Sequence, residues 1–522
     1  MPGKFYITTP IYYANAEPHI GSAYTTIAAD ILARWHRMKG DATFFLTGTD
    51  EHGQKIQEAA RASGMEPKEF VDSVSGKFRE MLEMISASND NFIRTTDEEH
   101  VKEVKDVLQR MFDGGFIYKG VYDAYYCVGC EQYLSKSELE DGKCPLHRKE
   151  PEIIKEECYM FRLSSFQEKL ASLIESGEYR IIPETRRNEI LSFIKEGLQD
   201  ISISRKKSKV WWGIEMPFDS ESTCYVWVDA FWNYVSGLKE KGAFDKFWPP
   251  DVQLMANDII RVHATIWPAI LLATGNSLPK CLFVHGYFTV NGQKMSKSLG
   301  NVVSPVQIVD KYGPDSLRYF LIRDIQFGQD GDFSEASLKE RVNNELGANF
   351  GNLFFRVTSF IEKNFGEVPV PGDAGEAEKS LEKRMKDTVD NVSSLMDDMR
   401  LTEALKEIMA LSSETNRYFQ DKEPWKKIKT DENDAKTSVY YAVNALKTIS
   451  ILLYPFMPRT GERAIKLLDT ELIVREIKPY ILRAESPESI KFDASTVWAG
   501  AGKLSVDSGS KVFSDILVKK IE

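Results

Sequence analysis

The sequence predicts an α/β chain in which an open parallel sheet is interrupted by an insertion and followed by an all-α bundle. Through the first 115 residues, short apolar runs of strand length alternate with segments of helical spacing, as in parallel strands joined by helices. The alternation stops at about residue 116 and resumes after about residue 220. Beyond about Ser334 the spacing is almost entirely helical to about Leu468, which is typical of a bundle.

The first elements follow each other directly along the chain. Residues 4–9 form a strand-like run that ends at Pro10. From Gly21 to Trp35, apolar residues recur three and four positions apart, and Gly40 ends this segment, so we expect a helix here. The continuous apolar run "ATFFLTG" then predicts a strand buried on both faces. Because parallel sheets bind ligands beyond the carboxyl ends of their strands, the loops after Thr9 and Leu46 are candidate site loops.

Two further helices are expected over residues 67–85 and 97–112, where apolar residues again follow helical spacing. The interrupting region contains tyrosine-rich strands, a Cys/His cluster, a helix near residues 166–175 and the basic run "SRKKSK". Strand and helix character returns in "TCYVWVDAFWNYV", "RVHATIWPAILLAT" and "CLFVHGYFTV". These segments indicate one sheet domain that contains an inserted domain.

Composition narrows the class of protein. A chain of 522 residues with 42% hydrophobic and 28% charged residues is typical of a folded protein of three or four domains. The net charge of −11 provides no overall attraction for a polyanion, so a nucleic acid would have to bind local patches. Neither a signal peptide nor an apolar run of membrane-spanning length is visible. We therefore expect a cytoplasmic protein with no membrane partner.

His19 lies immediately before the first predicted helix, in the string "PHIGS". The N–H groups and dipole of a helix N-terminus favour an anion, and Gly21 would let a flat ring or a phosphate approach the backbone. An imidazole there could donate hydrogen bonds to charge that develops on a phosphate. Taken alone the string is weak evidence, and a histidine that caps its own loop is the favoured alternative.

A second string changes this balance. "VNGQKMSKSLGN", residues 290–301, contains Lys294 and Lys297 between glycines. Such a segment suits a mobile loop that closes over a polyphosphate and meets developing charge with ammonium groups. A solvated basic turn is the ordinary alternative. The combination of this string with "PHIG" upstream is much more specific than either string alone.

A metal site is predicted in the inserted region. Cys127 and Cys130 form one C-x2-C pair, and Cys144 and His147 form a second pair after thirteen intervening residues. Three thiolates and an imidazole in two tight pairs suit a tetrahedral structural Zn²⁺, whereas unrelated buried thiols are the alternative. The remaining cysteines lack such partners and are expected in the core: Cys158, Cys224 and Cys281.

The two phosphate-site strings resemble the signatures of the class I aminoacyl-tRNA synthetases, and their surroundings are similar to the methionyl-tRNA synthetase family. In chain order, the matching segments are "TTPIYYANAEPHIG", "TGTDEHG", "VWVDA", "VHGYFTVNGQKMSKSLGN" and "KEPW". The resemblance covers essentially the whole chain. It implies that ATP, with Mg²⁺, activates L-methionine to methionyl-adenylate, which is then transferred to the 3′-terminal ribose of tRNA(Met). An insertion of only about a hundred residues fits this family better than the isoleucine, valine or leucine enzymes, which carry larger editing domains.

The resemblance also implies a division of the chain. A Rossmann-like catalytic domain would occupy residues 1–115 and 221–280, with a zinc-knuckle insertion at 116–220. A linking region with the lysine loop would span 281–334, and a helical anticodon-binding domain 335–475. A tail at 476–522 would pack back on the body. Because the chain stops where many relatives continue into a dimerising barrel, a monomer is expected.

Site residues follow from the same resemblance, position by position. The catalytic candidates are His19, Lys294 and Lys297. The ATP-binding candidates are His19, Gly21, Ser22 and Lys297. The methionine-binding candidates are Ile11, Tyr13, Asp50, Trp227, Tyr234 and His263. The anticodon-binding candidates are Asn352, Arg356 and Trp425. Aromatic walls suit a thioether and Trp425 could stack on an unpaired base, although core packing and a surface cation are the plain alternatives for the aromatic residues and for Arg356.

Two departures from the family pattern keep rival functions open. Ser22 stands where the first signature usually has a second histidine, and Ala256 and Asn257 stand where Gly-Lys usually precedes Asp258. One rival is an adenylyltransferase that is not a synthetase, which would share the phosphate site but would not need the bundle. The other is a catalytically weak or silent tRNA-binding paralogue.

Overall fold

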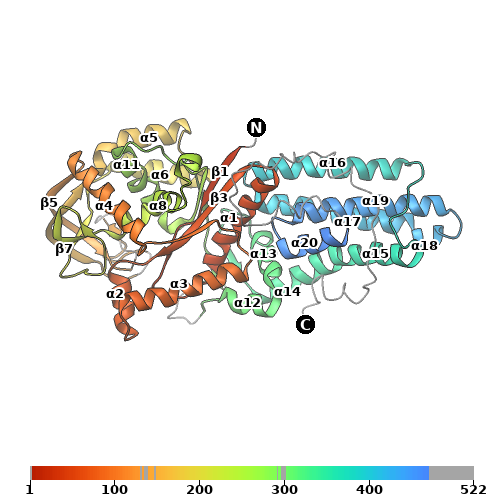
Figure 1. Cartoon of the computed structure of the whole chain (residues 1–522), viewed down its shortest axis with the longest axis horizontal. Coiled ribbons are helices and arrows are strands. Elements are labelled where there is room, and N and C mark those ends of the chain that lie inside the picture. Colours follow the sequence, from red (N-terminus) through yellow and green to blue (C-terminus); the bar gives the residue numbers. More distant parts are fainter. Residues whose placement is uncertain are drawn as a thin grey trace.

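The computed structural model of the chain describes residues 3–129, 132–134, 139–145, 148–290, 292–295 and 301–468. The expected tail at 476–522 lies outside the described residues. Figure 1 shows an elongated molecule, with strands and short helices at one end and long helices that lie side by side at the other. Among the described helices, none is both long and apolar enough to cross a bilayer.

The predicted open parallel sheet is confirmed. Its strands run in the order β2-β3-β1-β13-β14-β8, with β4 added on β3, and every pairing is parallel. The strands are β1 (Lys4–Thr8), β2 (Tyr12–Tyr13), β3 (Ala42–Asp50), β4 (Asn91–Arg94), β8 (Arg180–Ile182), β13 (Val252–Ala256) and β14 (Cys281–His285). This sheet therefore takes β8 from the range assigned to the insertion and β14 from the range assigned to the linking region.

The order of the strands places a switch point at the end of β1. Strand β1 pairs on one side with β3, which follows soon after it in the chain. On its other side β1 pairs with β13, which comes much later in the chain. A crevice opens where connections diverge in this way, beyond the carboxyl ends of the strands. The loop from Thr9 to His19 begins at this position.

Helices cover the sheet close to where the sequence predicts them. Helix α1 (Ile20–Met38) is buried along most of its length, and α3 (Pro67–Met84) and α4 (Glu98–Asp113) match the expected helices. A shorter helix, α2 (Gln54–Ala62), was not anticipated. It starts directly after the loop that follows β3.

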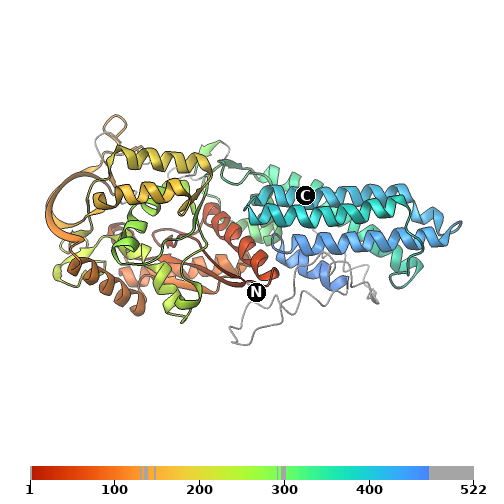
Figure 2. The ribbon, with the colours of Figure 1, turned by 90° about the horizontal axis from the view of Figure 1, so that it is seen from above.

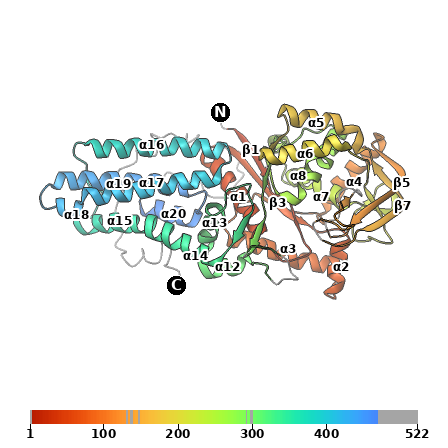
Figure 3. The same ribbon diagram turned by 180° about the vertical axis from the view of Figure 1, so that it is seen from behind.

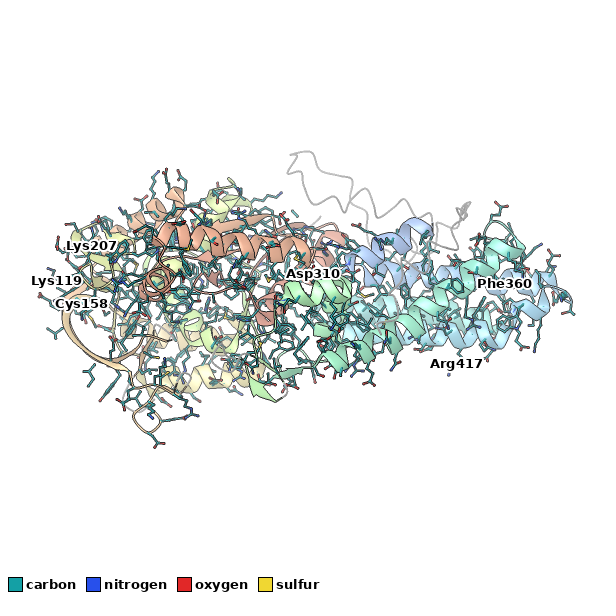
Figure 4. The ribbon with its side chains drawn as sticks, turned by 90° about the horizontal axis from the view of Figure 1, so that it is seen from below. Lys119, Cys158, Lys207, Asp310, Phe360 and Arg417 are labelled. Atoms are coloured by element: carbon teal, nitrogen blue, oxygen red, sulfur yellow. The ribbon has the colours of Figure 1, made fainter. Side chains whose placement is uncertain are left out.

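The inserted region forms a second, antiparallel sheet of order β6-β5-β7-β9. Its strands are β5 (Ile117–Cys127), β6 (Gln132–Leu134), β7 (Glu152–Phe161) and β9 (Ile201–Ser202). Helices α5 (Gln167–Ser176), as expected, and α6 (Glu184–Gly197) follow β7. A small sheet of β10 (Ser204–Lys206), β12 (Asp219–Cys224) and β11 (Glu215–Met216) leads back to the main domain. Figure 4 places Lys119, Cys158 and Lys207 together at this end of the molecule.

Short helices complete the domain of the parallel sheet: α7 (Val226–Phe231), α8 (Asn233–Lys239), α9 (Phe244–Phe247), α10 (Ile260–Ala264) and α11 (Ile266–Ala273). The linking region contains β15 (Phe288–Val290), β16 (Gln293–Lys294), β17 (Gly331–Phe333), α12 (Pro305–Tyr312) and α13 (Pro314–Arg323). In Figure 2, seen from above, the linking region lies between the sheet and the long helices.

The long helical stretch predicted from Ser334 to about Leu468 is confirmed. It comprises α14 (Glu335–Arg341), a π-helical segment (Val342–Gly351), α15 (Asn352–Asn364), α16 (Glu376–Asp397), α17 (Leu401–Lys422), α18 (Pro424–Lys427), α19 (Glu432–Leu453) and α20 (Pro458–Leu467). Figure 3 shows α16, α17 and α19 running side by side along the bundle.

A buried ion cluster joins the bundle to α1. The Asp30 carboxylate accepts a hydrogen bond from Arg34 at 2.7 Å and lies 2.8 Å from the Arg318 guanidinium, and Asp30 and Arg318 are fully buried. Arg318 also donates to the carbonyls of Pro455 and Phe456, between α19 and α20. Burial alone would raise the pKa of Asp30, but the two guanidiniums lower it to about 2. Breaking a buried pair of this kind is costly, so the bundle is held firmly against the middle of α1.

Candidate functional site

One cavity of about 590 Å³ lies at the switch point of the sheet. Most of the residues predicted for the phosphate and methionine sites line it, although they come from segments as far apart in the sequence as Ile11 and His263. They are Ile11, Tyr13, His19, Gly21, Ser22, Asp50, Trp227, Tyr234 and His263. Residues predicted to bind two different ligands therefore share one cleft.

The lysine loop begins and ends at the same cavity. Met295 and Val302, on either side of the loop, are part of its lining, and the N–H of Ile20 donates to the carbonyl of Val303 at 3.0 Å. Lys294 belongs to β16, which pairs antiparallel with β15, whereas Lys297 lies outside the described residues. The amino-terminal loop and the lysine-bearing segment thus converge on one site.

His19 caps helix α1. Its backbone is extended (φ −127°, ψ 172°), and its Nδ1 accepts the N–H of Gly21 at 3.1 Å. A Cβ at Gly21 would lie 2.9 Å from Cε1 of this ring, so the glycine makes room for the imidazole. Because Nδ1 accepts a hydrogen bond, the proton of the neutral ring is on Nε2. His19 therefore caps its own helix, as the plain alternative supposed, and also lines the cavity.

His285, at the end of β14, is a cavity residue that the sequence analysis missed. Its Nδ1–H donates to the carbonyl of Gly286 at 2.8 Å, and its Nε2 accepts from the hydroxyl of Thr25 at 2.7 Å. Burial lowers the pKa of His285 to about 4, so the ring is neutral. In the sequence, His285 could have been recognised as a site candidate because it ends an apolar run shortly before the lysine loop.

A second neutral histidine lies in the predicted methionine pocket. The Nδ1–H of His263 donates to the carbonyl of Ile259 at 2.9 Å, and its Nε2 is 2.9 Å from the hydroxyl of Tyr234. Burial lowers the pKa of His263 to about 4. A neutral ring whose Nδ1 carries the proton can only accept at Nε2, so Tyr234 donates its proton to His263.

Aromatic rings enclose the space next to this pair. The rings of Trp227 and Phe231 meet His263 edge to face, with centroids 6.1 and 5.0 Å away. The buried indole N–H of Trp227 has no hydrogen-bond partner in the part of the chain that the structure describes. Phe231 was not predicted, because an aromatic one helical turn after Trp227 could not be told from an ordinary core residue.

The loop that carries Asp50 is held by its neighbours. The buried carboxylate of Glu51 accepts two hydrogen bonds from Arg94, at 2.7 and 2.9 Å. Nδ1 of His52 lies 2.7 Å from one carboxylate oxygen of Asp229. The other oxygen of Asp229 lies 2.8 Å from Nε2 of the buried His100. Burial would raise the pKa of Asp229, but the two histidines lower it. These contacts fix Asp50 at the cavity wall.

The departures from the family pattern lie at the same cleft. Ser22 is a buried part of the cavity wall, and its carbonyl accepts from the hydroxyl of Tyr12 at 3.1 Å. Ala256 and Asp258 also line the cavity. The buried side-chain oxygen of Asn257 has no hydrogen-bond partner among the described residues. The altered positions therefore still lie at or next to the cavity wall.

Half of the predicted zinc set falls within the described residues. Cys127 and Cys144, one from each pair, are both buried in a small cluster with Leu134, as a shared site would require. Cys130 and His147 lie outside the described residues, and no group of three possible metal ligands occurs among those that are described. Gly129, next to Cys130 in the first pair, lines the cavity.

The predicted anticodon residues come together in the bundle. The guanidinium carbon of Arg356, on α15, lies 5.5 Å from the ring centroid of Trp425, on α18. Arg356 also donates to the side-chain oxygen of Gln420 at 2.8 Å, a neighbour that the sequence did not indicate. Asn352 is exposed one helical turn before Arg356. Figure 1 shows α18 at the end of the bundle that is farthest from the sheet.

Two family models match the sequence. The model described as "tRNA synthetases class I (M)" matches residues 5–150 and 129–358, and "Anticodon binding domain of methionyl tRNA ligase" matches residues 368–476. A methionine–tRNA ligase of Thermotoga maritima is 44% identical over 479 residues, which are 90% of this chain and 76% of that protein. A methionine–tRNA ligase of Rickettsia conorii is 41% identical over 499 residues, which are 93% and 97% of the two chains.

A solved structure supports the same relationship. Methionyl-tRNA synthetase of Mycobacterium tuberculosis bound by methionyl-adenylate is similar with a TM-score of 0.87 and 35% identity, over 94% of this chain and 100% of that chain. The family models, the sequence relatives and the fold agree across nearly the whole length. The chain belongs to the methionyl-tRNA synthetase family of the class I tRNA synthetases.

Proposed function

We propose that the chain is a methionine–tRNA ligase, which activates L-methionine with ATP and transfers it to the 3′-terminal adenosine of tRNA(Met). This proposal is supported by the cavity at the carboxyl end of β1. His19, Tyr234 and His263 line it, and so do Met295 and Val302 on either side of the lysine loop. Activation needs a triphosphate and an amino acid side by side, and a shared cleft supplies that proximity.

In the first step, a carboxylate oxygen of methionine attacks the α-phosphorus of ATP. A new O–P bond forms, the bond to the β-phosphate bridging oxygen breaks, and pyrophosphate leaves with the electron pair. Mg²⁺ accompanies ATP in this family. His19 donates from Nε2 to a phosphate oxygen, the Ser22 hydroxyl lies on the same wall, and Gly21 leaves space for the nucleotide. Lys294 and Lys297 stabilise the departing pyrophosphate, so catalysis is positioning and charge stabilisation without a side-chain nucleophile.

The amino acid is held at both ends. Asp50, at the end of β3, binds the ammonium group, and Ile11 and Tyr13 line the same cavity. The thioether lies among the rings of Trp227 and Tyr234 and next to His263, and polarisable sulfur interacts favourably with aromatic rings. Because the Tyr234 proton is given to His263, the pocket presents few donors to the side chain and favours an apolar substituent.

Transfer requires the 2′-hydroxyl of the tRNA terminus to attack the adenylate carbonyl, which releases AMP. Asn352 and Arg356 contact base edges of the anticodon, and Trp425 stacks on an unpaired base. Cys127, Cys130, Cys144 and His147 would hold a structural Zn²⁺, which stabilises the insertion when bound. A cytoplasmic location and a monomeric state remain predictions.

The proposal is tested by charging a purified tRNA pool and identifying the esterified amino acid, together with ATP–pyrophosphate exchange. We expect exchange that depends on methionine, and methionine alone on tRNA(Met). Exchange without any charging would favour a non-synthetase adenylyltransferase. Binding of tRNA without exchange would favour a catalytically silent paralogue.

A further inference from the structure

A large apolar side chain is exposed on the helix that carries two of the anticodon candidates. Phe355, on α15, exposes 47% of its surface to solvent. The same helix buries Leu353, Phe354, Val357 and Ile361 against the bundle. A single exposed apolar side chain is ordinary on a protein surface, so Phe355 is significant only through the residues beside it.

Phe355 lies at one edge of the strip that carries Asn352 and Arg356. Each residue of an α-helix is turned by about 100° from the one before, so Arg356 lies about 40° from Asn352 on one side and Phe355 about 60° on the other. Residues three and four positions apart are neighbours on a helix surface. Asn352 is therefore flanked by a guanidinium on one side and a phenyl ring on the other.

The opposite edge of the strip carries the other aromatic ring. Arg356 lies against Trp425, 5.5 Å from its centroid, and 5.6 Å from the ring of Phe419. From one side to the other, the surface therefore presents the Trp425 indole, the Arg356 guanidinium, the Asn352 amide and the Phe355 ring. In Figure 4, Phe360 of α15 and Arg417 of α17 mark this portion of the bundle, far from Lys119 at the other end.

We propose that Phe355 is a second stacking platform, on which a different unpaired anticodon-loop base rests from the one that stacks on Trp425. Two rings that flank an amide and a guanidinium suit successive splayed-out bases, which stack on aromatic faces and present their edges to polar groups. A phenyl ring has no polar atom, so Phe355 adds affinity without reading base identity. Asn352 and Arg356 then carry the base selectivity. This inference rests on the proposed function, because it assumes that tRNA(Met) docks on this surface.

The test measures binding of an RNA hairpin with the tRNA(Met) anticodon stem and loop. Phe355→Ala should weaken binding about tenfold, which converts to about 1.4 kcal/mol and lies within the range for stacking one base on an aromatic ring. Phe355→Tyr should bind like the parent. Methionine-dependent ATP–pyrophosphate exchange should not change, since it needs no tRNA. Val121→Ala, which removes a 67% exposed apolar side chain at the other end of the molecule, is the matched control and should bind like the parent.

A scan of abasic nucleotides along the loop then identifies the base. Coupled changes are non-additive in a double-mutant cycle, so one abasic position should abolish the effect of Phe355→Ala, and a different position should abolish that of Trp425→Ala. Equal binding by Phe355→Ala and the parent would overturn the inference, as would coupling of both variants to the same nucleotide. Failure of the proposed function would be recognised separately, because the parent itself would then neither bind the hairpin nor charge tRNA(Met).

Discussion

Replacing Gly21 by alanine tests how the phosphate site is built. The added Cβ would lie 2.9 Å from Cε1 and 3.0 Å from Nδ1 of His19, and the first separation is shorter than Cβ contacts in folded proteins. Because the obstacle is the end of a rotatable side chain, we expect the imidazole to turn away and the backbone to stay in place. The hydrogen bond from the Gly21 N–H to His19 would then be lost.

Two magnitudes follow from this displacement. Loss of a helix cap costs about 1 kcal/mol of stability, a small change for a chain of 522 residues. A catalytic group displaced by about 1 Å can cost about 100-fold in rate. Gly21→Ala should therefore fold normally, bind methionine like the parent, and catalyse methionine-dependent ATP–pyrophosphate exchange about 100-fold more slowly.

The assay is pyrophosphate exchange at saturating methionine, with methionine binding measured separately by intrinsic fluorescence. Gly76→Ala on α3 is the matched control, since a Cβ there meets no atom within 4 Å and alanine stabilises an exposed helix position by about 0.5–1 kcal/mol relative to glycine. Exchange by Gly21→Ala at the parent rate would show that the orientation of His19 is not needed for activation.

Four further predictions follow from the site. Tyr234→Phe leaves the buried Nε2 of His263 without its donor, so the free energy of unfolding should fall by about 1–3 kcal/mol. Because the His263 ring also loses the contact that orients it, the Kd for methionine should rise while the KM for ATP stays constant; a shared change in both constants would contradict the pocket assignment. The pKa of His263 is about 4 in the folded chain, whereas its ordinary value is 6.5. Between these pH values the folded chain binds fewer protons than the unfolded chain. The free energy of unfolding should therefore fall by up to about 3 kcal/mol as the pH drops from 6.5 to 4. Thermal unfolding measured at several pH values reports this loss of stability, which should be smaller in His263→Gln. The affinity for methionine should be constant between about pH 6 and 8. Lys297→Ala should lower adenylate formation by orders of magnitude in a single-turnover assay with little change in methionine affinity, and near-parental exchange would remove Lys297 from the mechanism. Elemental analysis should find one zinc per chain, lost in Cys144→Ala together with thermal stability, and an equal zinc content in both proteins would exclude the cluster.

Much of the fold was visible in local patterns. The helix that begins at Gly21 and ends before Gly40 follows from apolar spacing and a terminating glycine, and the structure places α1 at Ile20–Met38. The motif residues at the phosphate and methionine sites were identified by their strings, and the structure gathers most of them around one cavity. Ser22 and Ala256 could be recognised as departures, but not how they fit the wall.

Other features depended on partners far away in the chain. Strand β8 is only three residues long, and its place in the central sheet comes from pairing with β14, about a hundred residues later. His52 and Asp229 are 177 residues apart, yet they share a buried hydrogen bond that holds the Asp50 loop. No periodicity within either segment indicates such contacts.

The sequence by itself determined where most of the long helices and the first strands lie, which family the motifs match, and which side chains are candidates for each ligand. Those properties are local, since they depend on spacing and residue type within a few turns. Only the tertiary structure decided which ring nitrogens carry protons, why Gly21 must lack a side chain, and which rings flank Asn352. The reason is that tautomers, buried pKa values and steric limits are set by atoms that only the folded chain brings together.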